Sequence, residues 1–264
     1  MEIAGKTVVV TGAASGIGLA IAESCAADGA RLALADIEPT ALDRARDAFA
    51  ARGVDVIAVR TDVRHAAELE RLRDEVNRTF GGTDLLCNNA GVMSPLVPLW
   101  QSPVADLEWV FAVNLWGIVH GVRAFLPGMI ERGGPAHIVN TASMAAFGAA
   151  PHSAGYAMSK AAVVSMSCSL RDELLETGVG VSVLLPELIR TRLAYAERNR
   201  GDGAESYQED PAADVFKDGL DPGVIAERVI SAVREARFWI LPPPEDYFMQ
   251  AASAWMDGIR AASI

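Results

Sequence analysis

The sequence is poor in cysteine and in basic side chains, and it has no apolar run of membrane-spanning length. Its three cysteines among 264 residues, Cys25, Cys87 and Cys168, fall in expected helices or strands without metal-ligand spacing, so we expect them to be buried and reduced. With 23 basic against 34 acidic residues, the formal net charge of -11 argues against a nucleic-acid or anionic-membrane surface. No stretch reaches the ~18 to 20 apolar residues that a membrane span needs.

Targeting and linker signals are also missing. Residues 1–6 contain no charged leader followed by an apolar segment, so we expect a cytoplasmic protein. There is no internal repeat and no low-complexity linker, and 51% hydrophobic residues can fill the core of one large domain. We therefore expect a single domain over residues 1–264, with a cofactor half at about 1–140 and a catalytic and substrate part at about 141–264.

Short apolar strands alternate with helical stretches, which is the pattern of a doubly wound parallel sheet. Several of these strands are rich in Val and Leu throughout, as expected when both faces are covered. We predict an α/β, single-domain Rossmann fold with a parallel sheet of about seven strands and helices on both faces. The predicted strands are 6–11, 31–35, 54–59, 84–87, 136–140, 179–185 and 238–241, and the predicted helices include 16–28, 40–52, 65–79, 104–131 and 155–177.

A glycine-rich turn follows the first expected strand, in the stretch Thr11-Gly12-Ala13-Ala14-Ser15-Gly16-Ile17-Gly18. Gly12 permits a tight turn, Gly16 the close approach of a phosphate, and Gly18 the packing of helix on strand. The helix N-terminus offers free N–H groups and a partial positive charge to an anion. The pattern predicts a dinucleotide site that includes Ser15 and Ile17. The alternative is a glycine turn that binds nothing.

Asp36 ends the second apolar run and is followed by Ile37. An acidic group there is placed to accept hydrogen bonds from an adenosine ribose and to repel a 2′-phosphate. Neither the glycine loop nor Ile37 supplies a cation, so we expect this site to bind NAD in preference to NADP. Two alternatives stay open: Asp36 merely caps the next helix, or Arg44 and Arg46 reach an extra phosphate and NADP binds.

Tyr156 and Lys160 stand four residues apart, with Ser143 thirteen positions upstream. Four residues are slightly more than one helical turn, so the phenol and the ammonium share one helix face. A cation beside a phenol stabilises the phenolate and lowers its pKa from about 10. The spacing therefore predicts a tyrosine that takes a proton from an alcohol near neutral pH.

These residues resemble the short-chain dehydrogenase/reductase family over nearly the whole chain. Residues 11–18 match its cofactor loop, Asn88-Asn89-Ala90-Gly91 its sheet-stabilising motif, and Asn114, Ser143, Tyr156 and Lys160 its catalytic tetrad, in the expected order. The resemblance implies that Tyr156 takes the hydroxyl proton as hydride leaves for NAD, and that Ser143 holds the oxygen. It also implies that Lys160 anchors the nicotinamide ribose and Asn114 holds a water in the proton path. The residue pattern alone favours Asn114 as a polar helix residue bonded to backbone.

The same resemblance implies further contacts with the cofactor and the substrate. Asp62 and Val63 would contact adenine, Asn89, Ala90 and Gly91 would lie along the cofactor, and Ile189 and Thr191 would meet the nicotinamide carboxamide. Residues 127–129, 137–143 and 239–242 are similar to members that oxidise bulky, often aromatic or benzylic, secondary alcohols. We therefore expect a hydrophobic alcohol, of aromatic, terpenoid or steroid type, and no metal.

One stretch departs from the family pattern. After the sixth strand the family usually reads Pro-Gly-x-Val-x-Thr, whereas this chain has Pro186-Glu187-Leu188-Ile189-Arg190-Thr191. Glu187 loses the easy access of glycine to positive φ and places a carboxylate near the expected nicotinamide site. Either it points outward without effect, or it bonds a polar group of the substrate or pairs with Arg190 or Arg192.

The expected substrate pocket is apolar. Its walls would come from Met93, Met144, Phe147, Leu188 and Leu193, with Pro95 and Ala145, although such residues are also common core fillers. We interpret residues 192–221, a long irregular segment, as a lid over the substrate, the alternative being a surface insertion.

Small residues on the tyrosine-bearing helix permit close approach of another helix. They are Ala154, Gly155, Ala157, Ala161, Ala162 and Ser165. The family commonly packs this helix against a symmetry mate, so we expect a homodimer or homotetramer, unless these residues pack inside the monomer.

Three functions remain as alternatives to an NAD-dependent alcohol dehydrogenase. One is an NADP-dependent carbonyl reductase that works in the opposite direction. Another is a non-catalytic, nucleotide-sensing Rossmann protein, against which the intact tetrad argues. A methyltransferase that binds S-adenosylmethionine also uses a glycine loop and an acidic strand end, but it does not need the Ser, Tyr and Lys set.

Overall fold

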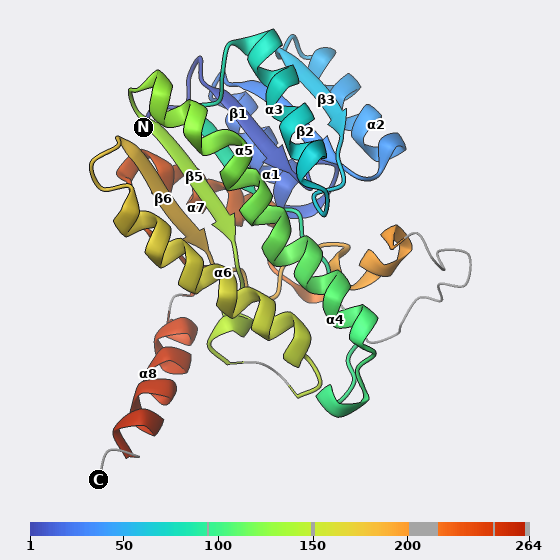
Figure 1. Cartoon of the computed structure of the whole chain (residues 1–264), viewed down its shortest axis with the longest axis vertical. Helices are drawn as coiled ribbons and strands as arrows, with labels where there is room; N and C mark the ends of the chain where they lie inside the picture. The colour runs from blue at the N-terminus through green and yellow to red at the C-terminus, as the bar shows by residue number, and fades with distance from the viewer. Residues whose placement is uncertain (94, 149–150, 201–215, 245, 262–264) are drawn as a thin grey trace.

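The protein is built around one parallel sheet, in a computed structural model that describes residues 1–93, 95–148, 151–200, 216–244 and 246–261 (Figure 1). Within this part of the chain the sheet has seven strands in the order β3-β2-β1-β4-β5-β6-β7. This confirms the predicted Rossmann fold. The strands are β1 (Thr7–Thr11), β2 (Arg31–Asp36), β3 (Val56–Arg60), β4 (Leu85–Asn88), β5 (Ala136–Thr141), β6 (Val179–Leu184) and β7 (Trp239–Ile240).

Helices cover both faces of the sheet. On one face, α1 (Gly16–Ala27), α2 (Pro39–Ala50) and α7 (Pro222–Glu235) share a hydrophobic cluster with the strands. On the other face lie α3 (Ala66–Phe80), α4 (Val104–Phe111), α5 (Gly117–Arg132) and α6 (Ala154–Glu173). The last helix, α8 (Asp246–Ala261), extends away from the sheet beside the C-terminus (Figure 1).

Alternating side chains along the central strands supply both clusters. Val8 and Val10 of β1 belong to the cluster under α1, whereas Val9 belongs to the cluster under α3 and α5. Leu32 and Ala33 of β2 divide in the same way. Successive strand residues point to opposite faces of the sheet. Because apolar residues follow one another in β1 and β2, both faces of these strands are buried.

Two parts of the fold differ from the sequence expectation. The single helix predicted over 104–131 is interrupted by a π-helical turn, Ala112–Trp116, between α4 and α5. The composite helix Val104–Arg132 is long and apolar enough to cross a membrane, by length and composition alone, which the sequence did not predict. Half of its most apolar window is buried in the fold, and such burial is typical of a core helix. The sequence reading also did not identify α7 and α8.

The carboxyl ends of the strands meet at one edge, and the strand order reverses there between β1 and β4. Ligands of open parallel sheets bind at this switch point. The segment after β6 begins at the same edge, and within it Ile189 pairs with Leu220 in a parallel bridge. Of the lid predicted at 192–221, the structure describes 192–200, with a 3-10 helix η4 (Leu193–Asn199), and 216–221, whereas 201–215 lie outside the described residues.

Candidate active site

The glycine loop leaves room for an anion at the start of α1. Gly12 has a φ of +66°, and a Cβ on it would lie 2.9 Å from the Ala90 Cα. A Cβ on Gly18 would lie 2.2 Å from the carbonyl oxygen of Gly12, so only glycine lets the helix pack this closely. Ser15, the N-cap residue, makes no side-chain capping bond, and the first N–H groups of α1 keep their capacity to bind an anion. This cradle fits a pyrophosphate.

Side chains fasten the ends of β1 and β4 together next to that cradle. The Thr11 hydroxyl accepts hydrogen bonds from the backbone N–H groups of Asn89 at 2.9 Å and Ala90 at 3.1 Å. The Asn89 amide donates back to the Thr11 carbonyl at 3.0 Å. These bonds therefore hold the ends of β1 and β4 close together, as the tight contacts of the glycine loop require.

Asp36 stands at the end of β2, facing the cavity. Its carboxylate accepts backbone hydrogen bonds from Ala14 at 2.9 Å and from Glu38 at 3.0 Å. Burial raises the pKa of Asp36 above its ordinary value, although these backbone hydrogen bonds partly oppose the rise. The carboxylate is thus fixed between the glycine loop and the start of α2, where an adenosine ribose would lie in this fold.

Asp62, expected near adenine, makes a bidentate ion pair with Arg64. The Arg64 Nε donates to both carboxylate oxygens at 3.0 Å. Burial raises the pKa of Asp62, but the hydrogen bonds and charge of Arg64 outweigh it and leave the pKa below its ordinary value. Both residues and the neighbouring Val63 line the cavity.

Tyr156 and Lys160 line another part of the cavity, and Ser143 is buried outside its wall. Ser143 follows β5; its hydroxyl donates to the Pro186 carbonyl at 3.3 Å and accepts the N–H of Ala145 at 3.1 Å. The Lys160 ammonium nitrogen lies 5.6 Å from the centre of the Tyr156 ring and donates to the Thr141 carbonyl at 2.9 Å. The structure thus joins residues from β5 and α6 into one cluster.

The pKa of Tyr156 differs from the sequence expectation. Burial raises the pKa of this phenol, and the hydrogen bond with Ser143 only partly opposes the rise. Burial also lowers the pKa of Lys160 to about 7. In the protein alone the pKa of the phenol therefore shifts upward, opposite to the sequence expectation, because burial is the larger effect.

Asn114 lies in the π-helical turn and is fully buried. Its side-chain oxygen accepts the Val92 N–H at 2.8 Å, and its amide donates to the Val92 carbonyl and to the Ser159 hydroxyl, both at 3.0 Å. These contacts attach the loop after β4 to α6, the helix that carries Tyr156. The side chain therefore positions the cluster, in agreement with the reading from the residue pattern alone.

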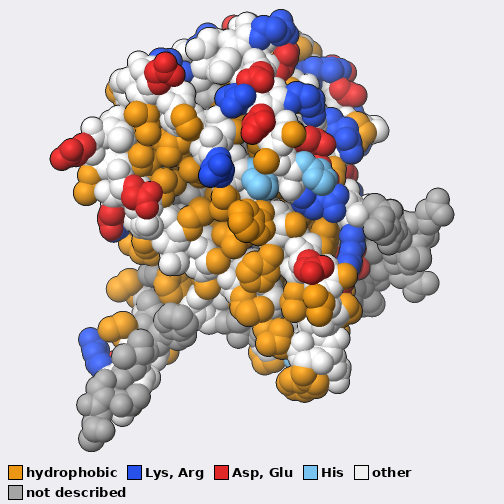
Figure 2. Space-filling view, viewed as in Figure 1, with side chains coloured by type: hydrophobic (Ala, Val, Ile, Leu, Met, Phe, Trp, Pro, Cys, Tyr) orange, Lys and Arg blue, Asp and Glu red, His pale blue; other side chains and the backbone are white. Residues whose placement is uncertain are grey.

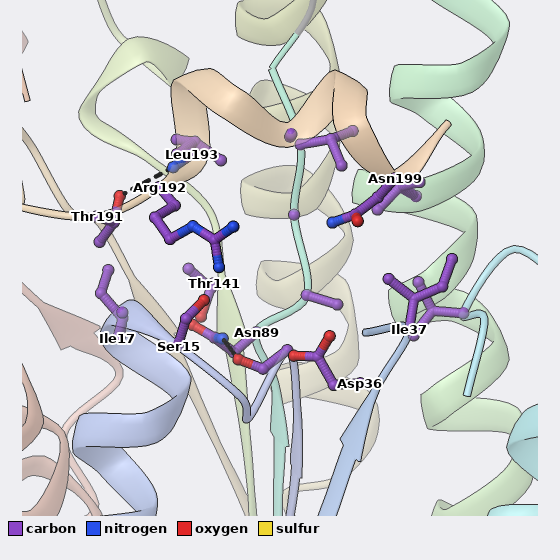
Figure 3. A pocket seen from close by; sticks show the side chains of 18 of the residues that line it. Ser15, Ile17, Asp36, Ile37, Asn89, Thr141, Thr191, Arg192, Leu193 and Asn199 are labelled. Carbon is purple, nitrogen blue, oxygen red and sulfur yellow. Dashed lines mark hydrogen bonds between the residues drawn. The ribbon is translucent and has the colours of Figure 1, made fainter. Parts of the chain in front are cut away.

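One cavity contains most of the residues singled out in the sequence. Figure 3 shows Ser15 and Ile17 at the start of α1, Asp36 at the end of β2 with Ile37 after it, and Thr191 to Leu193 from the segment after β6 around it. Its wall also holds these expected residues: Gly12, Gly16, Asp62, Val63, Asn89, Ala90, Gly91, Tyr156, Lys160, Glu187 and Ile189. Gly18 packs beneath the loop.

The expected apolar pocket residues are divided between cavity and core. Leu193 lines the cavity, whereas Met144 is buried in a third hydrophobic cluster with Ile118 and Val163. Phe147 packs against the same cluster and meets the Trp239 ring edge-on at 6.3 Å. Met93 and Leu188 are half-buried and lie outside the cavity wall.

Glu187 is exposed at the cavity wall, and the backbone explains why glycine is not needed there. Among the described non-glycine residues, only His152 and Ala236 have positive φ. The two arginines that the sequence offered as partners bind elsewhere: Arg190 pairs with Asp221, and Arg192 with Glu38. The carboxylate of Glu187 therefore faces the cavity without either of them.

Several cavity residues were missed by the sequence reading. Arg64, Arg192, Arg198, Asn199 and Phe216 line the wall together with Glu38. Glu38 had a local signal, since it follows Asp36 by two positions, but its partners lie more than 150 residues away. Within the described ranges, no group of three or more His, Cys, Asp or Glu side chains is arranged to hold a metal ion.

Comparisons with known proteins agree with this geometry. Residues 6–201 match the family model described as short chain dehydrogenase. A 1-deoxy-11-beta-hydroxypentalenate dehydrogenase from Streptomyces exfoliatus is 42% identical over 221 residues, which cover 82% of this chain and 80% of the relative. A C alpha-dehydrogenase from Sphingobium sp. is 30% identical over 243 residues, covering 89% and 80%. The fold is similar to the crystal structure of a short chain dehydrogenase/reductase from Burkholderia phymatum in complex with NAD, with a TM-score of 0.92, 39% identity, and coverage of 99% of this chain and 96% of that one.

Proposed function

The chain belongs to the short-chain dehydrogenase family, and from this premise we propose that it oxidises a hydrophobic secondary alcohol to the ketone with NAD. Membership makes the protein an NAD(P)-dependent oxidoreductase that acts on a hydroxyl-bearing substrate. The proposal adds the choice of cofactor, the direction of the reaction and the class of alcohol.

The observation that carries the proposal is that Tyr156 and Lys160, from one face of α6, line the same cavity as the glycine cradle, with the Lys160 nitrogen 5.6 Å from the Tyr156 ring. Tyr156 takes the hydroxyl proton of the alcohol, acting as the general base. Ser143 donates a hydrogen bond to the same oxygen and stabilises the negative charge that develops there. Bound NAD supplies the acceptor for the hydride of the carbinol carbon and a positive charge near the phenol.

Lys160 and Asn114 hold this arrangement in place. Lys160 is buried beside Gly91, where a Cβ would lie 3.5 Å from its ammonium nitrogen, and it directs that nitrogen to the Thr141 carbonyl. Its positive charge near the phenol favours the deprotonated form that the reaction needs. Asn114 bonds the loop after β4 to α6 and so fixes the position of that loop relative to Tyr156.

Asp36 supports the choice of NAD. Its carboxylate is held by two backbone N–H groups at the end of β2, the position that receives the ribose hydroxyls in this fold. A 2′-phosphate there would meet this negative charge at close range. The similar structure from Burkholderia phymatum holds NAD.

The apolar side chains of the wall support a hydrophobic substrate. Trp109, Val113, Leu193 and Phe216 line the cavity, and pockets lined in this way favour apolar ligands with a few polar anchors. The relatives named as dehydrogenases of a hydroxypentalenate support a bulky hydroxyl-bearing compound. We propose aromatic, terpenoid or steroid-like secondary alcohols.

The experiment is a panel of secondary alcohols, from small aliphatic to aryl and terpenoid compounds, offered with NAD and with NADP while the absorbance of the reduced nicotinamide is followed. The proposal expects turnover of bulky apolar alcohols with NAD and little with NADP. Ketone reduction that depends on NADPH would support a carbonyl reductase instead. Dinucleotide binding without turnover of any member would support a nucleotide-sensing protein.

We further propose that the enzyme is cytoplasmic and acts as a homodimer or homotetramer through α5 and α6. Figure 2 shows hydrophobic side chains gathered over this face. Trp116 and Met158 are exposed there, and Ala157, Ala161 and Ala162 are half-buried on α6, so a second helix can approach closely. Light scattering that finds a particle of one 28.0 kDa chain would contradict this assembly.

A further inference from the structure

Glu38 joins two parts of the cavity wall that are far apart in the sequence. It is the N-cap residue of α2, two positions after the end of β2, and its carboxylate accepts hydrogen bonds from the Arg198 guanidinium and, at 3.1 Å, from the Asn199 amide. The Arg192 guanidinium nitrogen lies 3.5 Å from its second oxygen. One carboxylate thus holds η4 and the residue before it against the start of α2.

This contact lies next to the residue that faces the adenosine ribose. The backbone N–H of Glu38 donates to the Asp36 carboxylate at 3.0 Å, and both side chains line the cavity. Figure 3 shows the Arg192 side chain extending into the cavity above Ser15 and Asn89. The guanidinium-bearing residues Arg192 and Arg198 both line this cavity.

Acidic groups offset the cationic groups in this wall. Arg64 forms its bidentate pair with Asp62, while Arg192 and Arg198 share Glu38. The Glu38 and Arg198 side chains are only 23% and 21% exposed, so solvent screens this pair less than an exposed one. Burial raises the pKa of Glu38, but the hydrogen bonds from Asn199 and Arg198 outweigh it and keep the carboxylate charged.

Guanidinium groups bind phosphate oxygens in a bidentate way, and they are the usual receptors of an extra phosphate. Without Glu38, Arg198 would keep its hydrogen bonds to the Arg192 and Tyr195 carbonyls, and both guanidinium groups would be open to an anion in the cavity. With Glu38 present, both guanidinium groups face its carboxylate. A 2′-phosphate would have to displace that carboxylate and would be repelled by its negative charge. The local charge around the ribose site therefore depends on Glu38 as well as on Asp36.

We propose that Glu38 is a second specificity-determining residue for the cofactor, which excludes a 2′-phosphate by engaging Arg192 and Arg198. The inference rests on the proposed function, since it assumes that the cavity binds NAD. Asp36 repels the phosphate directly, and Glu38 removes the cations that would attract it. Each residue accounts for part of the preference for NAD over NADP, and replacing either one alone should not abolish that preference.

The experiment measures the Kd of NADH and of NADPH by nicotinamide fluorescence for the wild type and a set of variants. Asp36→Ser removes the direct repulsion while its hydroxyl can still accept a backbone hydrogen bond. Asp36→Ser with Glu38→Gln should bind NADPH at least ten-fold more tightly than Asp36→Ser alone, whereas the NADH Kd should change by less than three-fold. Adding Arg198→Met to the double variant should remove most of that gain, and raised salt should weaken it.

Two controls separate the inference from general effects of charge and folding. Glu75→Gln in the Asp36→Ser background makes the same change in net charge at an exposed ion pair with Arg78, outside the cavity, and should leave the NADPH Kd unchanged. If thermal melts show that Glu38→Gln unfolds, Glu38→Asp provides a second variant. It keeps the negative charge and should keep the preference for NADH over NADPH.

The possible failures can be told apart. A wild type that binds NADPH more tightly than NADH, or that binds neither, overturns the proposed cofactor preference and the inference with it. A wild type that prefers NADH, combined with equal NADPH affinity of Asp36→Ser with and without Glu38→Gln, overturns the role of Glu38 alone.

Discussion

Lys160 holds its ammonium nitrogen 5.6 Å from the centre of the Tyr156 ring, and both side chains project from one face of α6. The four-residue spacing on a helix produces this proximity. The Thr141 carbonyl, at the end of β5, receives the ammonium at 2.9 Å and prevents it from turning away. The charge near the phenol is therefore fixed by the junction of a strand and a helix.

Lys160→Met should move the pH dependence of alcohol oxidation. Loss of the cation leaves the phenolate less stabilised, so the rising limb of kcat against pH should shift upward by about one unit or more. The profile is measured with saturating NAD and alcohol for the wild type and the variant. An unchanged midpoint would show that Lys160 serves only to bind the ribose.

Gly18→Ala should destabilise the protein and abolish dinucleotide binding. The new Cβ would lie 2.2 Å from the Gly12 carbonyl oxygen and 2.6 Å from the Asn89 amide nitrogen, so the loop and α1 have to separate. Gly128→Ala is the matched control in α5, where a Cβ meets nothing within 4 Å, and it should be neutral or stabilising by up to ~1 kcal/mol. Thermal melts and NADH titration check both variants. Equal behaviour of the two would contradict the close packing of the glycine loop.

His137 should make the protein less stable in acid. Its ring nitrogen Nε2 lies 2.7 Å from the Ser182 hydroxyl, which itself donates to the Arg237 carbonyl, so the ring acts as the donor to Ser182. Burial lowers the pKa of His137 to about 4. The unfolded chain takes up this proton as the pH falls below about 6.5, but the folded protein does so only near 4, so the free energy of unfolding falls across that window by up to ~3 kcal/mol.

Denaturant unfolding between pH 7 and 4 measures this loss. His137→Gln should flatten the decline, whereas His152→Asn, at an exposed side chain with a positive φ that Asn tolerates, should leave it as in the wild type. The same slope in all three proteins would contradict a buried neutral His137.

Glu187→Gln should raise the KM for the true substrate several-fold while kcat changes by less than two-fold. The carboxylate is exposed at the cavity wall, and Arg190 and Arg192 are engaged by other acids, so it is available to a polar group of the alcohol. Glu176→Gln, exposed outside the cavity, is the control. An unchanged KM would mean that the Glu187 carboxylate only faces solvent.

Local patterns in the sequence predicted the strands well, because burial on both faces leaves a direct trace. Val8, Val9 and Val10 serve two clusters in turn, and each predicted strand lies within two residues of its observed bounds. The π-helical turn at Asn114 left no such trace, since the apolar pattern continues through it from α4 into α5. The side chain that it turns inward then bonds Val92 and Ser159.

The site was predicted only as far as spacing and motifs reach. Ser143, Tyr156 and Lys160 were predicted from their spacing and from the family motif, whereas the raised pKa of the phenol comes from burial that no motif records. The pairing of Glu38 with Arg198 spans 160 positions and depends on how the segment after β6 folds back over the cavity. Such contacts require the three-dimensional structure.

Tyr156→Phe tests the central claim most directly, because it removes one oxygen from the proposed base and leaves the ring in place. The account predicts a fall in kcat for alcohol oxidation of about 10²- to 10⁴-fold, with NADH affinity within a few-fold of the wild type. Turnover of the variant at close to the wild-type rate, with the dinucleotide still bound, would contradict it.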